Sequence, residues 1–100
     1  MNDNISISTG GYKNLTGSQA IKYLKKNNIF SIELSGGKYS KNLIKQIITY
    51  KKKLNLRVHN YFPPPKIPFV INLASDDKKI LNKSISHIKK SILLVKKLGG

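Results

Sequence analysis

Residues 56–75 read LRVHNYFPPPKIPFVINLAS, and they divide the chain into two kinds of structure. The first five residues alternate apolar and polar side chains, which predicts a β-strand over 56–60. Pro63, Pro64 and Pro65 exclude a regular ladder or helix after it, because proline has no amide hydrogen and a fixed φ. A rigid, partly apolar loop that follows a strand ending in a histidine and an asparagine is typical of ligand sites in α/β proteins.

The segments on both sides of this stretch predict alternating strands and helices. Helical connections between successive strands imply a parallel sheet with right-handed crossovers. We expect serines to cap the helices, and we expect Asp76 and Asp77 in the first turn of the last helix, where the helix dipole favours anions. The predicted strands cover residues 4–9, 29–35 and 56–60; the predicted helices begin at Ser18, Ser40 and Ser75 and end at Asn27, Lys53 and Leu98.

The alternation within each strand narrows the architecture. Strands of an open, doubly wound sheet are covered on both faces and read as continuous apolar runs. Here each strand has one apolar and one polar face, so helices should cover only the first, and the polar face should meet water or a barrel lumen. This pattern favours a (β/α) barrel over a flavodoxin-like sheet. The expected apolar face holds Ile5, Ile7, Phe30, Ile32, Leu34, Leu56 and Val58; the polar face holds Ser6, Ser8, Ser31, Glu33, Ser35, Arg57 and His59; the last helix should bury Leu81, Ile85, Ile88, Ile92 and Val95.

The length allows only part of a barrel. Eight βα units need about 250 residues, whereas this chain has 100 residues and three predicted units. We therefore expect an α/β fold in which residues 1–100 form the N-terminal part of one TIM-barrel domain, as a fragment, a truncated reading frame or one piece of a larger assembly.

Composition excludes several classes of protein. The chain has no cysteine, which excludes disulfides and thiolate metal sites. Its N-terminus is polar and its apolar runs are short, so we expect a cytoplasmic protein without a membrane partner. The net charge is +15, but only Arg57 among 19 basic residues is arginine, the usual reader of phosphates and bases. Because the lysines are scattered over every predicted helix, we interpret them mainly as solvated surface.

Several short motifs resemble those of the xylose-isomerase-like TIM barrels. They are the strand Ile32-Glu33-Leu34 with Gly36-Gly37, then Val58-His59-Asn60-Tyr61, then Asn72-Leu73-Ala74-Ser75, and finally the long helix that closes with Leu98-Gly99. The superfamily contains sugar-phosphate isomerases and epimerases and metal-dependent apurinic/apyrimidinic endonucleases. The chain is most similar to the isomerase side. The resemblance implies an active site at the carboxyl ends of the strands, which often holds a divalent metal.

The resemblance implies a metal-ligand role for His59, which matches a histidine at the end of the third strand in the endonuclease branch. The alternative is a hydrogen-bonded histidine at a strand end. Glu33, Asn60 and Asn72 are the candidate substrate-binding residues; equally, Glu33 fits an ion pair with Arg57, and asparagines in loops often bind backbone. A single glutamate supplies no acid/base pair, so we assign no catalytic residue. We interpret His87, beside the last helix stripe, as packing or surface.

Three functions follow as hypotheses. The first is the N-terminal portion of a sugar-phosphate isomerase or epimerase, which binds a divalent cation only when the barrel is complete and is inactive alone. The second is an endonuclease-like DNA-binding protein. The third is a non-catalytic remnant that associates with itself through uncovered apolar surface.

Overall fold

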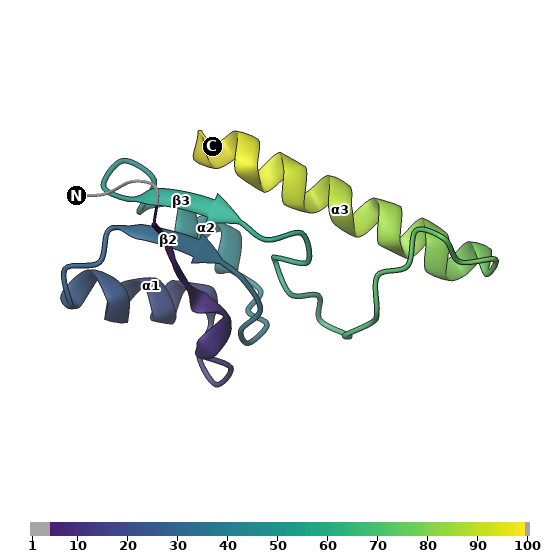
Figure 1. The fold of residues 1–100 in the computed structure, drawn as a ribbon, viewed down its shortest axis with the longest axis horizontal. Coiled ribbons are helices and arrows are strands. Elements are labelled where there is room, and N and C mark those ends of the chain that lie inside the picture. The colour runs from purple at the N-terminus through teal and green to yellow at the C-terminus, as the bar shows by residue number, and fades with distance from the viewer. Residues whose placement is uncertain (1–4, 100) are drawn as a thin grey trace.

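The computed structural model describes residues 5–99, and within them three parallel strands alternate with three α-helices (Figure 1). The sheet order is β1-β2-β3, and a 3-10 helix, η1, follows β1. The predicted α/β class and the β-α-β-α-β-α order are confirmed. The strands are β1 (Ile7–Ser8), β2 (Ser31–Leu34) and β3 (Asn55–Val58); the helices are η1 (Thr9–Gly11), α1 (Gly17–Lys26), α2 (Leu43–Ile48) and α3 (Lys78–Leu98).

One face of the sheet carries the hydrophobic core. Ile32 of β2 lies in register with Ile7 of β1 and with Leu56 of β3, so these side chains share a face. The core joins this face to residues from all three α-helices, which therefore lie on the same side of the sheet. The strand alternation predicted this arrangement correctly. The buried core residues are Ile21, Leu24, Ile32, Leu34, Leu43, Ile47, Leu54, Leu56, Phe62, Leu94 and Leu98.

The apolar residues at the start of the chain depart from the prediction. Ile7 lies on the apolar face but remains 42% exposed, and Ile5 is 64% exposed. The strand β1 has two residues instead of the predicted six, and Asn4 lies outside the described residues. Among the described elements no strand pairs with the outer edge of β1. The edge position leaves these two isoleucines without cover.

The helix α3 buries a different side from the one predicted. Ile85 and Ile92 of the predicted stripe are exposed, and the other three members, Leu81, Ile88 and Val95, are only half-buried. The residues that α3 buries are Ser84, His87, Ser91, Leu94 and Leu98.

The loop of residues 59–77 between β3 and α3, which we call the proline loop, explains this orientation of α3. Its backbone has no ladder partner, and buried carbonyl and amide groups require hydrogen bonds. The Ser91 hydroxyl donates to Asn60 O at 3.0 Å and also lies within bonding distance of Phe62 O. His87 bonds the carbonyl of Tyr61 through Nε2 at 2.5 Å. The polar side of α3 therefore faces inward because it supplies hydrogen-bond partners that an isoleucine stripe lacks.

The start of α1 shows why the predicted cap was displaced by two residues. The N-cap is Thr16, not Ser18: its hydroxyl accepts from Gln19 N at 3.2 Å, and the Gln19 side chain accepts from Thr16 N at 2.9 Å. This reciprocal capping box satisfies two amide donors that a single serine cap would leave partly unpaired. Gly37 (φ +85) packs against the same turn, where a Cβ would lie 3.0 Å from Leu15 O.

The other two helices, in contrast to α1, begin later than predicted. The N-cap of α2 is Asn42 instead of Ser40, and the residues after Ile48 form turns instead of extending the helix to Lys53. The N-cap of α3 is Asp77, whose carboxylate accepts from Lys79 N at 2.9 Å, so Asp76 and Asp77 precede the first turn. At the other end, Gly99 (φ 74) caps α3 as predicted.

Candidate functional site

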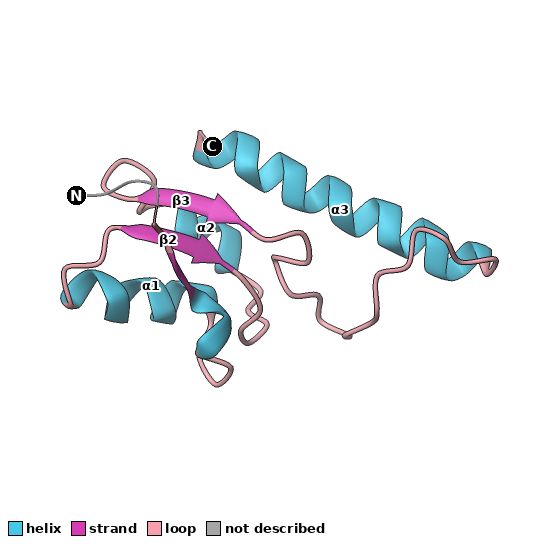
Figure 2. Ribbon diagram, viewed as in Figure 1, coloured by secondary structure: helices cyan, strands magenta, loops and turns pink. Residues whose placement is uncertain are grey.

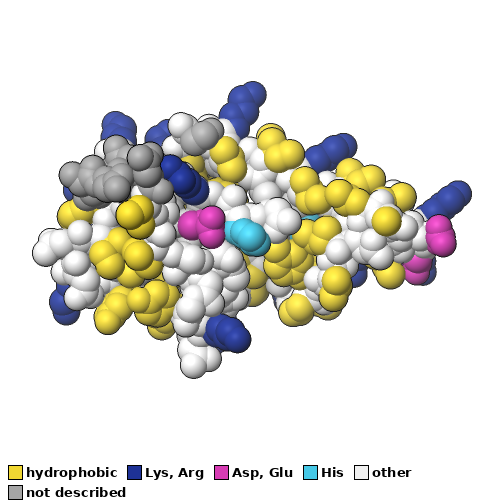
Figure 3. Space-filling view, in the orientation of Figure 1, with side chains coloured by type: hydrophobic (Ala, Val, Ile, Leu, Met, Phe, Trp, Pro, Cys, Tyr) yellow, Lys and Arg dark blue, Asp and Glu magenta, His cyan; other side chains and the backbone are white. Residues whose placement is uncertain are grey.

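The polar face of the sheet carries a network of short side chains next to the first strand. Ser31 is 4% exposed, and its hydroxyl bonds the Ser6 hydroxyl at 2.9 Å and accepts from Asn55 Nδ2 at 3.2 Å. Nearby, Thr9 Oγ1 donates to Ser35 O and accepts from Ser35 N, both at 2.8 Å. These bonds hold the ends of β1 and β2 together and fix the polar face, which Figure 3 views from the front.

Glu33 and His59 lie on this polar face at neighbouring strand ends. Glu33 is half-buried and lies in register with Ser8 on one side and Arg57 on the other. His59 follows β3 two residues after Arg57, and its amide donates to Leu34 O at 2.8 Å, which extends the ladder by one bond. The imidazole, the guanidinium and the carboxylate therefore share one face at the carboxyl edge of the sheet, as the alternation predicted.

The described residues offer at most part of a metal site at this edge. His59 is exposed and lies two residues beyond Arg57, which is the register partner of Glu33. An imidazole and a carboxylate suit a divalent transition metal. Among residues 5–99, however, no cluster of three or more histidine, aspartate or glutamate side chains is positioned to hold an ion. A stable site would need further ligands, so the metal role of His59 stays a prediction.

The two candidate asparagines occupy different places along α3. The carbonyl of Asn60 accepts from Ser91, whereas Asn72 N donates to Ser84 Oγ at 2.9 Å. The two serines are seven residues apart, which is about 10 Å along a helix. The Asn72 side chain accepts from Ala74 N at 3.0 Å within its own loop. Asn60 thus stays beside the strand end, while Asn72 shapes the loop near the start of α3; substrate binding by either remains a prediction.

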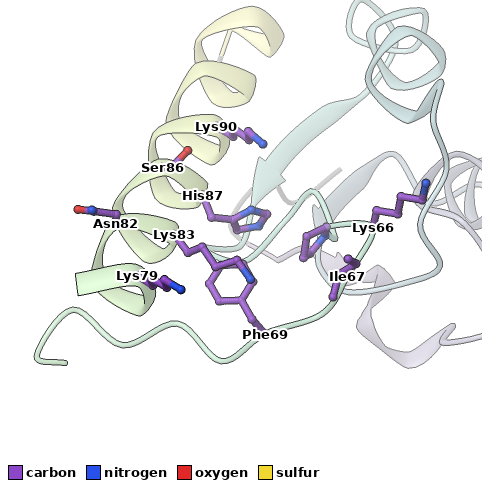
Figure 4. A pocket seen from close by; sticks show the side chains of 10 residues that line it. Lys66, Ile67, Phe69, Lys79, Asn82, Lys83, Ser86, His87 and Lys90 are labelled. Carbon is purple, nitrogen blue, oxygen red and sulfur yellow. The ribbon is translucent and has the colours of Figure 1, made fainter. Parts of the chain in front are cut away.

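A second candidate site, which sequence reasoning missed, lies between α3 and the proline loop (Figure 4). It is an open hollow of about 700 Å³. A signal was present, because Lys79, Lys83, His87 and Lys90 recur at spacings of four, four and three residues and so lie on one side of a helix. We call this hollow the lysine cleft. Its lining residues are Pro65, Lys66, Ile67, Phe69, Lys79, Asn82, Lys83, Ser86, His87 and Lys90.

Comparison of the chain with family models, curated proteins and solved structures yields no match. In the part of the chain that the structure describes, no helix combines the length and the apolar character needed to cross a membrane.

Proposed function

We propose that this chain forms the first three βα units of a TIM-barrel sugar-phosphate isomerase or epimerase, and that these units alone are inactive. The observation that carries the proposal is the single-sided cover of the sheet. All three α-helices contribute to one core on one face, and polar side chains occupy the other face at the carboxyl ends of the strands. Barrel units have this arrangement, whereas open doubly wound sheets place helices on both faces.

Uncovered apolar surface at both ends of this layer supports the same proposal. Ile7 on β1 is 42% exposed, and Ile92 on α3 is 61% exposed. Among the described residues β3 pairs only with β2, so its other edge carries no strand. In a closed barrel, neighbouring βα units cover both edges of such a layer. The sheet therefore presents the surfaces that additional units would bury.

The chemistry assigned to the site follows from its polar edge. His59 would bind a divalent cation, and Glu33, Asn60 and Asn72 would line the substrate pocket. When bound, the cation supplies Lewis acidity that polarises a sugar carbonyl or hydroxyl. Moving a proton between neighbouring carbons also requires a pair of acid and base groups, and Glu33 is the only glutamate in the chain. The second group must come from further units, which is why we expect no turnover from these three.

Paramagnetic Mn²⁺ tests the proposed ligand directly. In a ¹⁵N-labelled sample, Mn²⁺ should broaden the amide signals of residues 33–35 and 57–60 at a lower Mn²⁺ concentration than the signals of other residues. The reason is that paramagnetic relaxation falls steeply with the distance between the ion and the amide. His59→Gln should abolish this selectivity and leave the remaining spectrum in place. His59 is exposed, so the substitution should not unfold the protein.

Among residues 5–99 the competing carboxylates are Asp76 and Asp77, just before the first turn of α3. Broadening centred on these two residues in wild type, or broadening at residues 57–60 that persists in His59→Gln, would count against the metal site. Exchange of a carbon-bound sugar-phosphate proton with solvent, catalysed by the purified chain, would contradict the proposal that the three units are inactive alone.

The net charge of +15 supports a second candidate, an endonuclease-like DNA-binding protein. Its affinity should fall steeply with salt, because lysines that contact phosphates release counterions. It should also prefer abasic duplex over intact duplex. Fluorescence anisotropy with both duplexes over a salt series tests this, and equal affinity for the two would reject it.

The exposed apolar residues of α3 support a third candidate, a non-catalytic remnant that self-associates. Light scattering over a concentration series should then show growth of the particle mass. A single monomeric species at every concentration would reject this candidate.

A further inference from the structure

The lysine cleft has two walls of different chemistry. On the loop side, Pro65, Ile67 and Phe69 form an apolar wall. On the helix side, Lys79, Lys83 and Lys90 extend from α3 toward the same space (Figure 4). None of the ten lining residues is acidic, so the cationic wall is not neutralised from within the cleft. Such a cleft fits a ligand with an apolar part and an anionic part.

The apolar wall is rigidly built. The ring of Phe69 lies 5.8 Å from that of Tyr61 and 5.7 Å from that of His87, and the latter two rings are 4.9 Å apart. The Phe69 amide also donates to the Tyr61 hydroxyl at 2.9 Å. His87 is itself 5% exposed and bonds the Tyr61 carbonyl. Because a carbonyl only accepts hydrogen bonds, the bonded Nε2 carries a proton, and this bond fixes the ring against the loop.

The lysines reach the aromatic wall. Lys83 Nζ lies 5.2 Å from the centre of the Phe69 ring, within the range of a cation–π contact. Lys66 and Lys90 also border a neighbouring hollow of about 300 Å³, where Lys41 adds a further cation. The positive charge thus continues past the aromatic group, which gives room for more than one phosphate.

We propose that the lysine cleft binds a nucleoside phosphate, with the base against Phe69 and the phosphates on the lysines of α3. A nucleobase offers a flat apolar face that stacks on an aromatic ring, and lysine ammonium groups donate to phosphate oxygens. This site uses none of the residues at the carboxyl edge of the sheet, so it stands or falls independently of the isomerase proposal. It also accounts for Ile67, which is 73% exposed at the rim of the cleft.

Isothermal titration with ATP, inorganic tripolyphosphate and adenosine tests the proposal. Tripolyphosphate carries at least as much negative charge as ATP and lacks a base. We expect ATP to bind at least about fivefold more tightly than tripolyphosphate, because stacking on an aromatic ring adds to affinity. Adenosine should bind most weakly. Equal or tighter binding of tripolyphosphate would overturn the proposal, because it would reduce the interaction to adhesion of a polyanion to a basic protein.

Two double variants with the same change of charge on the same helix locate the site. Lys79→Gln with Lys90→Gln removes two lysines of the cleft and should weaken ATP binding about tenfold or more. Lys89→Gln with Lys96→Gln removes two exposed lysines of α3 that do not line the cleft, and should change the affinity less than about twofold. Equal losses in the two variants would overturn the proposal.

The aromatic contact needs a separate measurement. Phe69→Leu should remove most of the preference for ATP over tripolyphosphate. In wild type, ATP should shift the ring proton signals of Tyr61, Phe69 and His87 and leave those of His59 unchanged. This readout does not depend on the stability of a variant, and shifts centred on His59 instead would overturn the assignment of the site.

Discussion

The sheet with α1 and α2 forms the first half of this molecule, and the proline loop with α3 forms the second. The two halves are held together in different ways. In the first, α1 and α2 pack apolar side chains such as Ile21 and Ile47, both fully buried, onto the sheet. In the second, residues 84–91 of α3 contact the proline loop through the side chains of Ser84, His87 and Ser91, which bond its backbone. Figure 2 shows that the segment between β3 and α3 is loop throughout. A helix that covers a loop must satisfy polar groups, whereas a helix that covers a sheet need only exclude water.

This difference also decides which surfaces stay open. The apolar packing of α1 and α2 leaves a few large apolar side chains exposed there, such as Tyr23. Because α3 turns its polar side inward, Ile80, Ile85, Ile92 and Leu93 remain exposed. In the first half the exposed isoleucines, Ile5 and Ile7, lie at the edge strand, whereas the second half presents both an uncovered apolar stripe and the lysine cleft. The hollow for which we propose a nucleoside phosphate therefore lies in the second half.

The largest difference between the halves should appear when an isoleucine is truncated in each. Ile21→Ala in α1 should lower the free energy of unfolding by about 2–5 kcal/mol, because it leaves a cavity in the core. Ile92→Ala in α3 should change it by less than about 0.5 kcal/mol, since this side chain is 61% exposed. Urea unfolding followed by circular dichroism measures both. A large loss in Ile92→Ala would show that the stripe of α3 is buried in solution.

The contact between the two halves is the next most sensitive place. Phe62, from the proline loop, is fully buried, and a Cβ on Gly17 at the start of α1 would lie 2.9 Å from its ring. Gly17→Ala should therefore destabilise the protein by about 1–3 kcal/mol through overpacking. Gly11→Ala is the control, because nothing lies within 4 Å of a Cβ there. If both variants unfold at the wild-type urea concentration, the loop does not pack on α1 as described.

Loss of a single hydrogen-bonding side chain in the second half should cost slightly less. Ser91→Ala removes the hydroxyl that bonds the carbonyls of Asn60 and Phe62, and should destabilise by about 1–2 kcal/mol. Ser86→Ala, at an exposed position on the same helix, should be close to neutral. Amide hydrogen exchange adds a sharper test, since protection around residues 60–62 should fall only in Ser91→Ala. Equal protection of residues 60–62 in Ser91→Ala and Ser86→Ala would show that the Ser91 hydroxyl does not stabilise the loop.

The smallest expected effect concerns the start of α1. Thr16→Ala removes the hydroxyl that accepts from Gln19 N, leaves the backbone amide that donates to the Gln19 side chain, and should cost about 1 kcal/mol. Ser18→Ala should change the free energy of unfolding by less than about 0.5 kcal/mol, because Ser18 makes no cap in the structure. A larger loss of stability in Ser18→Ala than in Thr16→Ala would show that Ser18 caps α1, as the sequence alone predicted.

Short-range patterns predicted much of this architecture. The alternation of strands and helices, the parallel order and the single apolar face follow from periods of two and of 3.6 residues, which are local properties. The pairing of Glu33 with Arg57 across the sheet was also within reach, because both belong to the polar face. Element ends were less predictable: Thr16 and Ser18, or Asp77 and Ser75, are all residues suited to a cap, and the choice depends on which amides they reach.

The sequence by itself determined that the chain is an α/β layer with helices on one side, because the alternation of its strands is incompatible with cover on both faces. Only the tertiary structure decided how α3 is turned. Its stripe of Leu81, Ile85 and Ile92 predicts burial, yet the unpaired backbone of the proline loop required donors and acceptors that only the serine and histidine side could give. That long-range requirement also brought Phe69 next to Lys83 and so created the lysine cleft.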